Sequence, residues 1–272
     1  MKLPLWFVIP LICICPGSLL SVCSASPPSH SRDLLWGIPP ASPDDEAAWK
    51  WVSDPWIATD KAYSVATKEI TTLNKRELDD YSSKCDEDLN ANPSSRILTY
   101  KWALATWLSA DTHIHWAKRA QRFYRVRAAL QVLSPPYNYE LARIRFLYIS
   151  FFDNGRRVRP LGEALLKRNP QDFEVQFGQI KVLEGIYALH ADPDVRSELI
   201  ELGERLLADS PDASRAHGAK GSVYLSLWNA NRTSRDLADK AIAEYTEYLR
   251  LAPSDDWFRR SAEKIIAQLR RG

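Results

Sequence analysis

Glycine is scarce in this sequence, with 10 residues in a chain of 272. Glycine supplies the unusual backbone angles of tight turns and of glycine-rich nucleotide loops, so its scarcity argues against β-rich and glycine-loop nucleotide-binding folds. Long helices need little glycine. The chain also has a single methionine but 10 tryptophans, which indicates a core built on large, rigid aromatic side chains.

Catalytic and cofactor motifs are missing as well. The sequence contains no G-x-S-x-G, H-E-x-x-H, Walker loop or G-x-G-x-x-G. The nearest approach to a metal site is Asp111 with the His113-x-His115 pair; such a pair can bind zinc, but no further ligand follows at a useful spacing. We interpret these residues as the start of a helix near Trp116. We therefore expect no enzyme activity, no catalytic residues, no cofactor and no bound metal.

Cysteine is confined to four positions, and three of them, Cys13, Cys15 and Cys23, lie near the N-terminus. If the N-terminal segment that holds these three is cleaved off, Cys85 is the one cysteine left, so it has no partner for an intrachain disulfide. Its neighbours Asp86 and Asp88 disfavour the thiolate, which argues against a nucleophile. We expect a buried apolar filler; the alternative is a thiol that links two copies.

The N-terminus has the pattern of an export signal. Lys2 precedes the apolar segment 3–15, Pro16 breaks it, and Ala25 ends a small-residue cleavage box. Residues 1–25 are predicted to be a signal peptide and residues 26–43 a Pro/Ser-rich tether. The expected location is the periplasm, the cell envelope or the exterior.

A second processing route stays open. Residues 20–23, Leu-Ser-Val-Cys, resemble a bacterial lipobox in which Cys23 becomes the lipidated first residue. Val22 departs from the Gly, Ala or Ser that such boxes prefer. Under this alternative the protein is a lipoprotein, and Cys23 is its one expected link to a membrane.

Charge is segregated along the chain. Residues 33–95 carry 6 Lys/Arg against 13 Asp/Glu, residues 96–168 carry 14 against 4, and residues 169–272 carry 14 against 17. The basic block suggests a surface for an acidic protein, an anionic envelope polymer or an anionic membrane surface, whereas nucleic acid is not expected for an exported chain of net charge +2. The alternatives are neutralisation by neighbouring helices or a solvated face. The predicted partner-binding residues are Lys118, Arg122, Arg125, Arg143, Arg145, Arg156 and Arg157.

Prolines recur at regular intervals. The steps from Pro93 to Pro135, Pro170, Pro211 and Pro253 are 42, 35, 41 and 42 residues. Each interval fits one helix pair with its turns, and the apolar positions between them have helical periodicity. No convincing strand is present.

Two helix starts and one modification motif stand out. Asp192 before Pro193 predicts a capped helix start, and Thr233 with Asp236 resembles a capping box. Asn231-Arg232-Thr233 is an N-glycosylation sequon, which is relevant if the source is eukaryotic.

Residues 212–253 contain a specific set of small and aromatic residues: Gly221, Tyr224, Ala241, Tyr245, Tyr248 and Pro253. This set resembles the tetratricopeptide repeat (TPR), in which small residues admit close helix crossings and aromatics fill the adjoining gaps. The resemblance implies an all-α fold, a right-handed α-α superhelix of about four to five TPR-like helix pairs plus a C-terminal capping helix. It would form a single TPR-like domain over 44–272, with a concave groove for peptides or proteins.

The expected function is that of a non-enzymatic scaffold for protein–protein interaction in the cell envelope. One alternative is a lipid-anchored envelope assembly or secretion factor. Another is a small hydrolase of envelope polymers built on a helical-repeat body. Trp49, Trp51 and Trp56 are expected to cap the first repeat, with sugar or base stacking as the alternative.

Overall fold

The computed structural model describes residues 61–109, 116–131, 133, 137–152, 158–256 and 258–271. Every regular element within these ranges is an α-helix, which confirms the all-α prediction for this part of the chain. The predicted signal peptide, the tether, Cys23 and the three tryptophans at 49, 51 and 56 lie outside the described residues, as do Asp111, His113 and His115.

Two compact units make up the chain, with the change near residue 138. The helices of the first are α3 (Lys61–Thr71), α4 (Lys75–Ala91), α5 (Arg96–Ser109) and α6 (Trp116–Gln131). Helix α5 is central, since it packs against α3, α4 and α6. A hydrogen bond of 2.7 Å between the buried hydroxyls of Ser82 and Thr106 joins α4 to α5.

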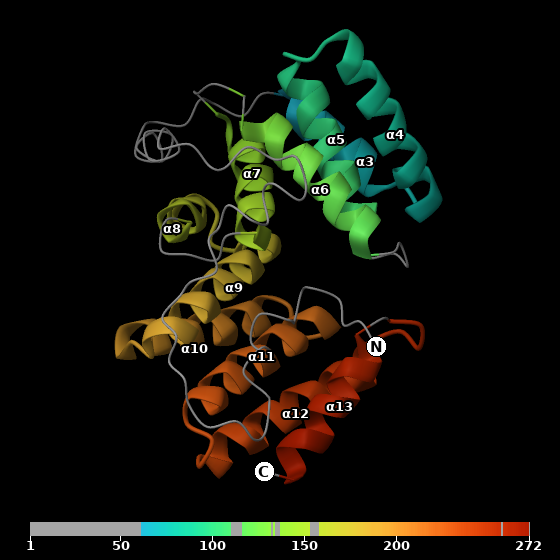
Figure 1. Ribbon diagram of the computed structural model, residues 1–272. Coiled ribbons are helices and arrows are strands. Elements are labelled where there is room, and N and C mark those ends of the chain that lie inside the picture. Colours follow the sequence, from blue (N-terminus) through green and yellow to red (C-terminus); the bar gives the residue numbers. More distant parts are fainter. Residues whose placement is uncertain are drawn as a thin grey trace, which may run out of the picture. The chain divides into compact units, whose positions relative to one another are not determined.

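The second unit holds seven helices among its described residues, coloured yellow-green to red in Figure 1. They are α7 (Tyr139–Phe152), α8 (Arg159–Arg168), α9 (Phe173–His190), α10 (Pro193–Asp209), α11 (Ser214–Ala230), α12 (Arg235–Leu251) and α13 (Arg259–Arg271). Three of the predicted proline joints separate these helices: Pro170 lies between α8 and α9, Pro211 between α10 and α11, and Pro253 between α12 and α13.

The helices of the second unit pack in a repeating order. Helix α7 packs against α8 and α9; α9 packs against α10 and α11; and α8 and α10 pack against the helix that follows each of them. The odd-numbered helices α7, α9 and α11 therefore form one continuous series. Between Val175 and Tyr187 every residue of α9 is buried except Lys181, which is half-buried, so this helix is the centre of the unit.

Close helix crossings depend on small residues. A β-carbon added to Gly221 of α11 would lie 3.1 Å from the ring of Tyr245 on α12, and one added to Gly218 would lie 3.2 Å from Tyr248. Both tyrosines are buried. The small-against-aromatic contact expected for residues 212–253 is thus present between these two helices.

Helix starts agree with the sequence in one case and differ in another. Asp192 caps α10 through its side chain, and Pro193 follows in the first turn, as predicted. The capping box predicted at Thr233 is wrong by one residue: Ser234 is the N-cap of α12, and its hydroxyl accepts from the Leu237 amide. Thr233 instead donates to the side chain of Asn231.

None of the described helices combines the length and the hydropathy needed to cross a bilayer.

Candidate functional site

The predicted basic residues of the first unit lie on α6 and are paired with acids of α4. Arg122 Nη1 lies 2.9 Å from Asp79 Oδ1, and Arg125 Nη2 lies 2.8 Å from Asp86 Oδ1. The Arg125 guanidinium also lies 5.6 Å from the ring centre of Trp102. Lys118 belongs to α6, but its side chain is outside the described residues.

The predicted basic residues of the second unit are less accessible. Arg143 Nε lies 2.6 Å from Asp172 Oδ2, which also accepts from the Tyr139 hydroxyl at 2.8 Å. Burial and the negative charge of Asp172 raise the pKa of Tyr139. Arg145 is buried, at 3% exposure, so it cannot contact a partner directly. Arg156 and Arg157 lie outside the described residues.

These ion pairs connect the basic block of the sequence to both acidic blocks. Arg122 and Arg125 pair with acids from residues 33–95, while Arg143 and Arg159 pair with Asp172 and Glu198 from residues 169–272. Acids on neighbouring helices therefore neutralise much of the charge of the basic block. This is the first of the two alternatives to a partner surface given above.

Cys85 is buried against the helices of the first unit, at 5% exposure. Burial, opposed by Lys101 and helped by the nearby acids Asp88 and Glu69, raises the pKa of its thiol to about 11. A thiol in this setting is inert toward electrophiles at neutral pH, in agreement with the expected filler role. In the described ranges no group of three His, Cys, Asp or Glu side chains is arranged to hold a metal ion.

A cluster of aromatic and charged side chains on α9 and α11 was not predicted. The rings of Phe173 and Phe177 stack at 6.4 Å, and the Arg215 guanidinium lies 5.2 and 5.1 Å from their centres. Arg215 also donates two hydrogen bonds to the two carboxylate oxygens of Glu174, at 2.6 and 3.1 Å. We call Phe173, Phe177, Glu174 and Arg215 the α9–α11 surface cluster.

Within the α9–α11 surface cluster Phe177 is buried, and Arg215 is the member that is both fixed in orientation and well exposed. The Arg215 side chain is 44% exposed, whereas that of Glu174 is 17% exposed. Bidentate pairing and stacking both hold the guanidinium in a fixed orientation. Arginine and aromatic residues fixed in this way are the groups that most often dominate the binding energy of protein interfaces.

A second, buried cluster joins the same two helices. Lys181 Nζ donates to Glu184 Oε2 and to Ser222 Oγ, both at 2.8 Å, and the Ser222 hydroxyl lies 2.6 Å from Glu184 Oε1. A serine beside a lysine and a glutamate suggests a nucleophile, but Ser222 is only 2% exposed. A substrate cannot reach this hydroxyl, so the cluster serves as a structural bridge between α9 and α11.

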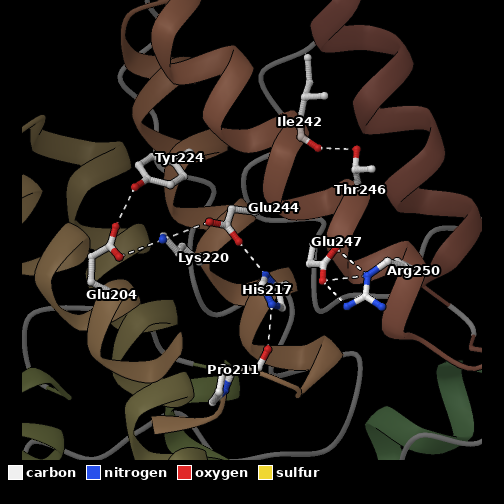
Figure 2. Close-up of polar contacts among 10 residues, drawn as sticks. All are labelled: Glu204, Pro211, His217, Lys220, Tyr224, Ile242, Glu244, Thr246, Glu247 and Arg250. Carbon is white, nitrogen blue, oxygen red and sulfur yellow. Dashed lines mark hydrogen bonds and ion pairs between the residues drawn. The ribbon is translucent and has the colours of Figure 1, made fainter. Parts of the chain in front are cut away.

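Figure 2 shows a third polar group, which ties α10 and α12 to α11. Lys220 Nζ lies between Glu204 Oε2 at 2.8 Å and Glu244 Oε1 at 3.1 Å, and Tyr224 donates to Glu204 at 3.0 Å. Burial lowers the pKa of Lys220, but its bonds to the two glutamates outweigh burial and leave that pKa raised. The lysine is therefore charged and neutralised from both sides.

His217 extends this network to the turn before α11. One ring nitrogen lies 2.8 Å from Glu244 Oε2, and the other lies 3.0 Å from the carbonyl oxygen of Pro211, as Figure 2 shows. The side chain is 12% exposed. The proline joint, the first turn of α11 and the middle of α12 are thus fixed to one another.

The sequence indicates only some of the residues that form these clusters. Phe173, Phe177 and Lys181 follow each other at steps of four, which places them on one helical face. Arg215 comes from the next helix pair, and nothing in the local sequence indicates which residue of α9 it meets. Contacts between successive helix pairs need the three-dimensional structure.

Searches against protein-family models, curated proteins and solved structures found no match to this chain.

Proposed function

We propose that the chain is an exported, non-enzymatic TPR-like scaffold that binds a protein partner in the cell envelope. The observation that carries this proposal is the packing order of the second unit. Helices α7 and α9 each contact the even-numbered helix that follows and also the next odd-numbered helix. A stack of helix pairs with this order is the arrangement of repeat scaffolds, whose continuous first-helix face binds peptides and proteins.

The superhelical, TPR-like character is part of the proposal. The contacts of Gly221 with Tyr245 and of Gly218 with Tyr248 support it, because the small-aromatic set of residues 212–253 closes the α11–α12 crossing. Helix α13 buries Ala262, Ile265, Ile266 and Leu269, which suits a capping helix. The export route rests on the N-terminal sequence, with lipidation of Cys23 as the alternative form of the same function.

The α9–α11 surface cluster is the proposed partner surface. Its two helices belong to the odd-numbered series, and it offers an oriented guanidinium beside two stacked rings. The basic residues first expected to bind an acidic partner support this role less well. Arg143 and Arg145 are largely or fully buried, while Arg122 and Arg125 remain partly exposed beside their acids.

Affinity capture tests the proposal. The mature chain, residues 26–272, is used as bait for an envelope extract of the native host. Arg215→Ala and the pair Arg122→Glu/Arg125→Glu serve as variant baits, and Arg205→Ala is the matched control. Arg205 is 41% exposed and pairs with Glu201 on its own helix, so it resembles Arg215 in exposure and charge pairing.

Three outcomes separate the hypotheses. A protein retained by wild type and Arg205→Ala but lost by Arg215→Ala supports the scaffold and its surface. If the Arg122→Glu/Arg125→Glu bait alone fails to retain the protein, the partner surface is on α6 and not at the α9–α11 surface cluster. Recovery of no specific protein by any bait would count against the scaffold.

A further inference from the structure

The sequon Asn231-Arg232-Thr233 lies in the turn between α11 and α12, a place no packing role explains. All three residues are exposed. It is also the one Asn-x-Ser/Thr triplet of the sequence whose middle residue is not proline, because Asn92-Pro93-Ser94 fails that requirement. We propose that Asn231 is an N-glycosylation site, modified by a lipid-linked oligosaccharide diphosphate during export.

The turn presents the asparagine side chain in a defined way. The Asn231 amide N–H donates to the carbonyls of Leu227 and Trp228, at 3.2 and 2.9 Å, and ends α11. Its own carbonyl accepts from the Ser234 amide at 3.0 Å. These bonds involve only the backbone of Asn231, and the residue is exposed to solvent.

The side-chain hydrogen bonds of the sequon leave the nitrogen that glycosylation modifies available. The Thr233 hydroxyl donates to Asn231 Oδ1 at 2.8 Å, which uses the oxygen of the carboxamide and not its nitrogen. The side-chain nitrogen Nδ2 of Asn231 forms no hydrogen bond with any residue that the structure describes. Arg232, between them, is turned away, since its guanidinium lies 5.6 Å from the Trp228 ring centre.

The reaction balances without a redox partner. The Asn231 side-chain nitrogen attacks the first carbon of the reducing-end sugar and forms an N–C bond. The bond from that carbon to the diphosphate oxygen breaks, the lipid diphosphate leaves, and the amide nitrogen loses one proton. The folded turn can carry a glycan because all three residues of the sequon are exposed.

The modification deepens the proposed function. It rests on export, which is part of that function, and on a eukaryotic source, whose secretory route supplies the lipid-linked donor. A glycan at the α11–α12 turn would keep that end of the helix pair clear of protein contacts. It would leave the α9–α11 surface cluster accessible, since Arg215 lies at the opposite end of α11.

The test uses the full chain expressed in a eukaryotic secretory host. One version keeps its own residues 1–25, and the other has them replaced by an established secretory leader. Secreted protein is treated with peptide N-glycosidase and weighed by mass spectrometry. We expect a single glycan at Asn231, lost in Asn231→Gln and in Thr233→Ala, kept in Thr233→Ser, and unaffected by Asn92→Gln.

The two leaders separate the inference from the function. Chain secreted by the established leader but bare at Asn231 overturns the glycosylation inference, whatever its own leader does. Chain retained in the cell with its own residues 1–25, yet glycosylated with the established leader, contradicts the proposed export and leaves the site intact. Thr233→Ala keeps Asn231 itself, so its loss of glycan cannot be ascribed to a folding defect at that residue.

Discussion

Gly162 of α8 lies against the ring of Phe146 of α7, so closely that an added β-carbon would come within 2.9 Å of Phe146 Cε2. The same β-carbon would lie 2.0 Å from the side-chain oxygen of Gln179 on α9. Phe146 and Gln179 are both buried, so neither can move aside without displacing its neighbours. This glycine therefore sets the approach of three helices.

Gly162→Ala is expected to destabilise the protein by about 1–3 kcal/mol, because the added methyl group would overpack the core. Gly203→Ala is the matched control, since its added β-carbon would find ordinary contact with Val223 at 3.5 Å. That change should stabilise the protein by up to about 1 kcal/mol, because alanine is the better helix former. Urea unfolding measures both, and equal effects of the two changes would contradict the predicted contact.

Tyr245 and Tyr248 differ in what their hydroxyls do. The Tyr245 hydroxyl is buried and has no hydrogen-bond partner among the described residues, whereas Tyr248 donates to Asp256. Tyr245→Phe should stabilise the protein by about 1 kcal/mol because it removes an unsatisfied polar group, while Tyr248→Phe should cost about 1 kcal/mol. Thermal unfolding of both variants gives the comparison; a loss of stability with Tyr245→Phe would show that its hydroxyl is bonded.

Removal of Lys181 should lower the free energy of unfolding, because it leaves a buried carboxylate unpaired. Lys181→Met leaves the Glu184 carboxylate, whose side chain is 6% exposed, without its cation, and we expect a loss of about 3 kcal/mol. The double change Lys181→Met/Glu184→Gln should recover most of this loss.

Lys240→Met is the control for this cycle, because Lys240 and Asp236 form an exposed pair on α12. Its effect should stay within about 0.5 kcal/mol. Denaturant unfolding supplies all of the values. A double variant as unstable as the single Lys181→Met would mean that the two charges are not coupled.

Stability should fall in alkaline solution. Burial raises the pKa of Cys85 from 9.0 to about 11 and that of Tyr224 from 10.0 to about 12, the latter helped by Glu204. Between the ordinary and the raised pKa, the unfolded chain loses a proton that the folded chain keeps, so rising pH favours unfolding. The contribution of Cys85 is complete below pH 9 and is lost as pH rises toward 11.

Unfolding free energies measured at intervals from pH 8 to 11 test this dependence. Cys85→Ala should lessen the decline between pH 9 and 10, where Tyr224 contributes little. An unchanged slope in this variant would show that the thiol has an ordinary pKa in the folded protein.

Much of the helical framework follows from the sequence. Pro93, Pro170, Pro211 and Pro253 each lie between two helices because proline cannot continue the first but is tolerated at the start of the second. Asp192 caps α10 through a local bond that its position before Pro193 predicts. Short-range rules suffice where the interacting residues are close in the chain.

The candidate site could not be predicted in the same way. Arg122 and Arg125 share a face of α6, as their spacing requires, but the acids that pair with them lie on α4, 43 and 39 residues earlier. Glu174 and Arg215 are 41 residues apart. Such pairs depend on which helices become neighbours, and charge counts along the chain do not specify that.

We propose that the protein binds its partner through the α9–α11 surface cluster. The most direct measurement is a titration of the captured partner with wild type, Arg215→Ala and Arg205→Ala, each checked for helicity by circular dichroism. If Arg215 is an interface anchor, Arg215→Ala should raise the dissociation constant about thirtyfold, equivalent to about 2 kcal/mol. The dissociation constant of Arg205→Ala should stay within about twofold of wild type. Equal affinities of all three proteins would contradict the claim.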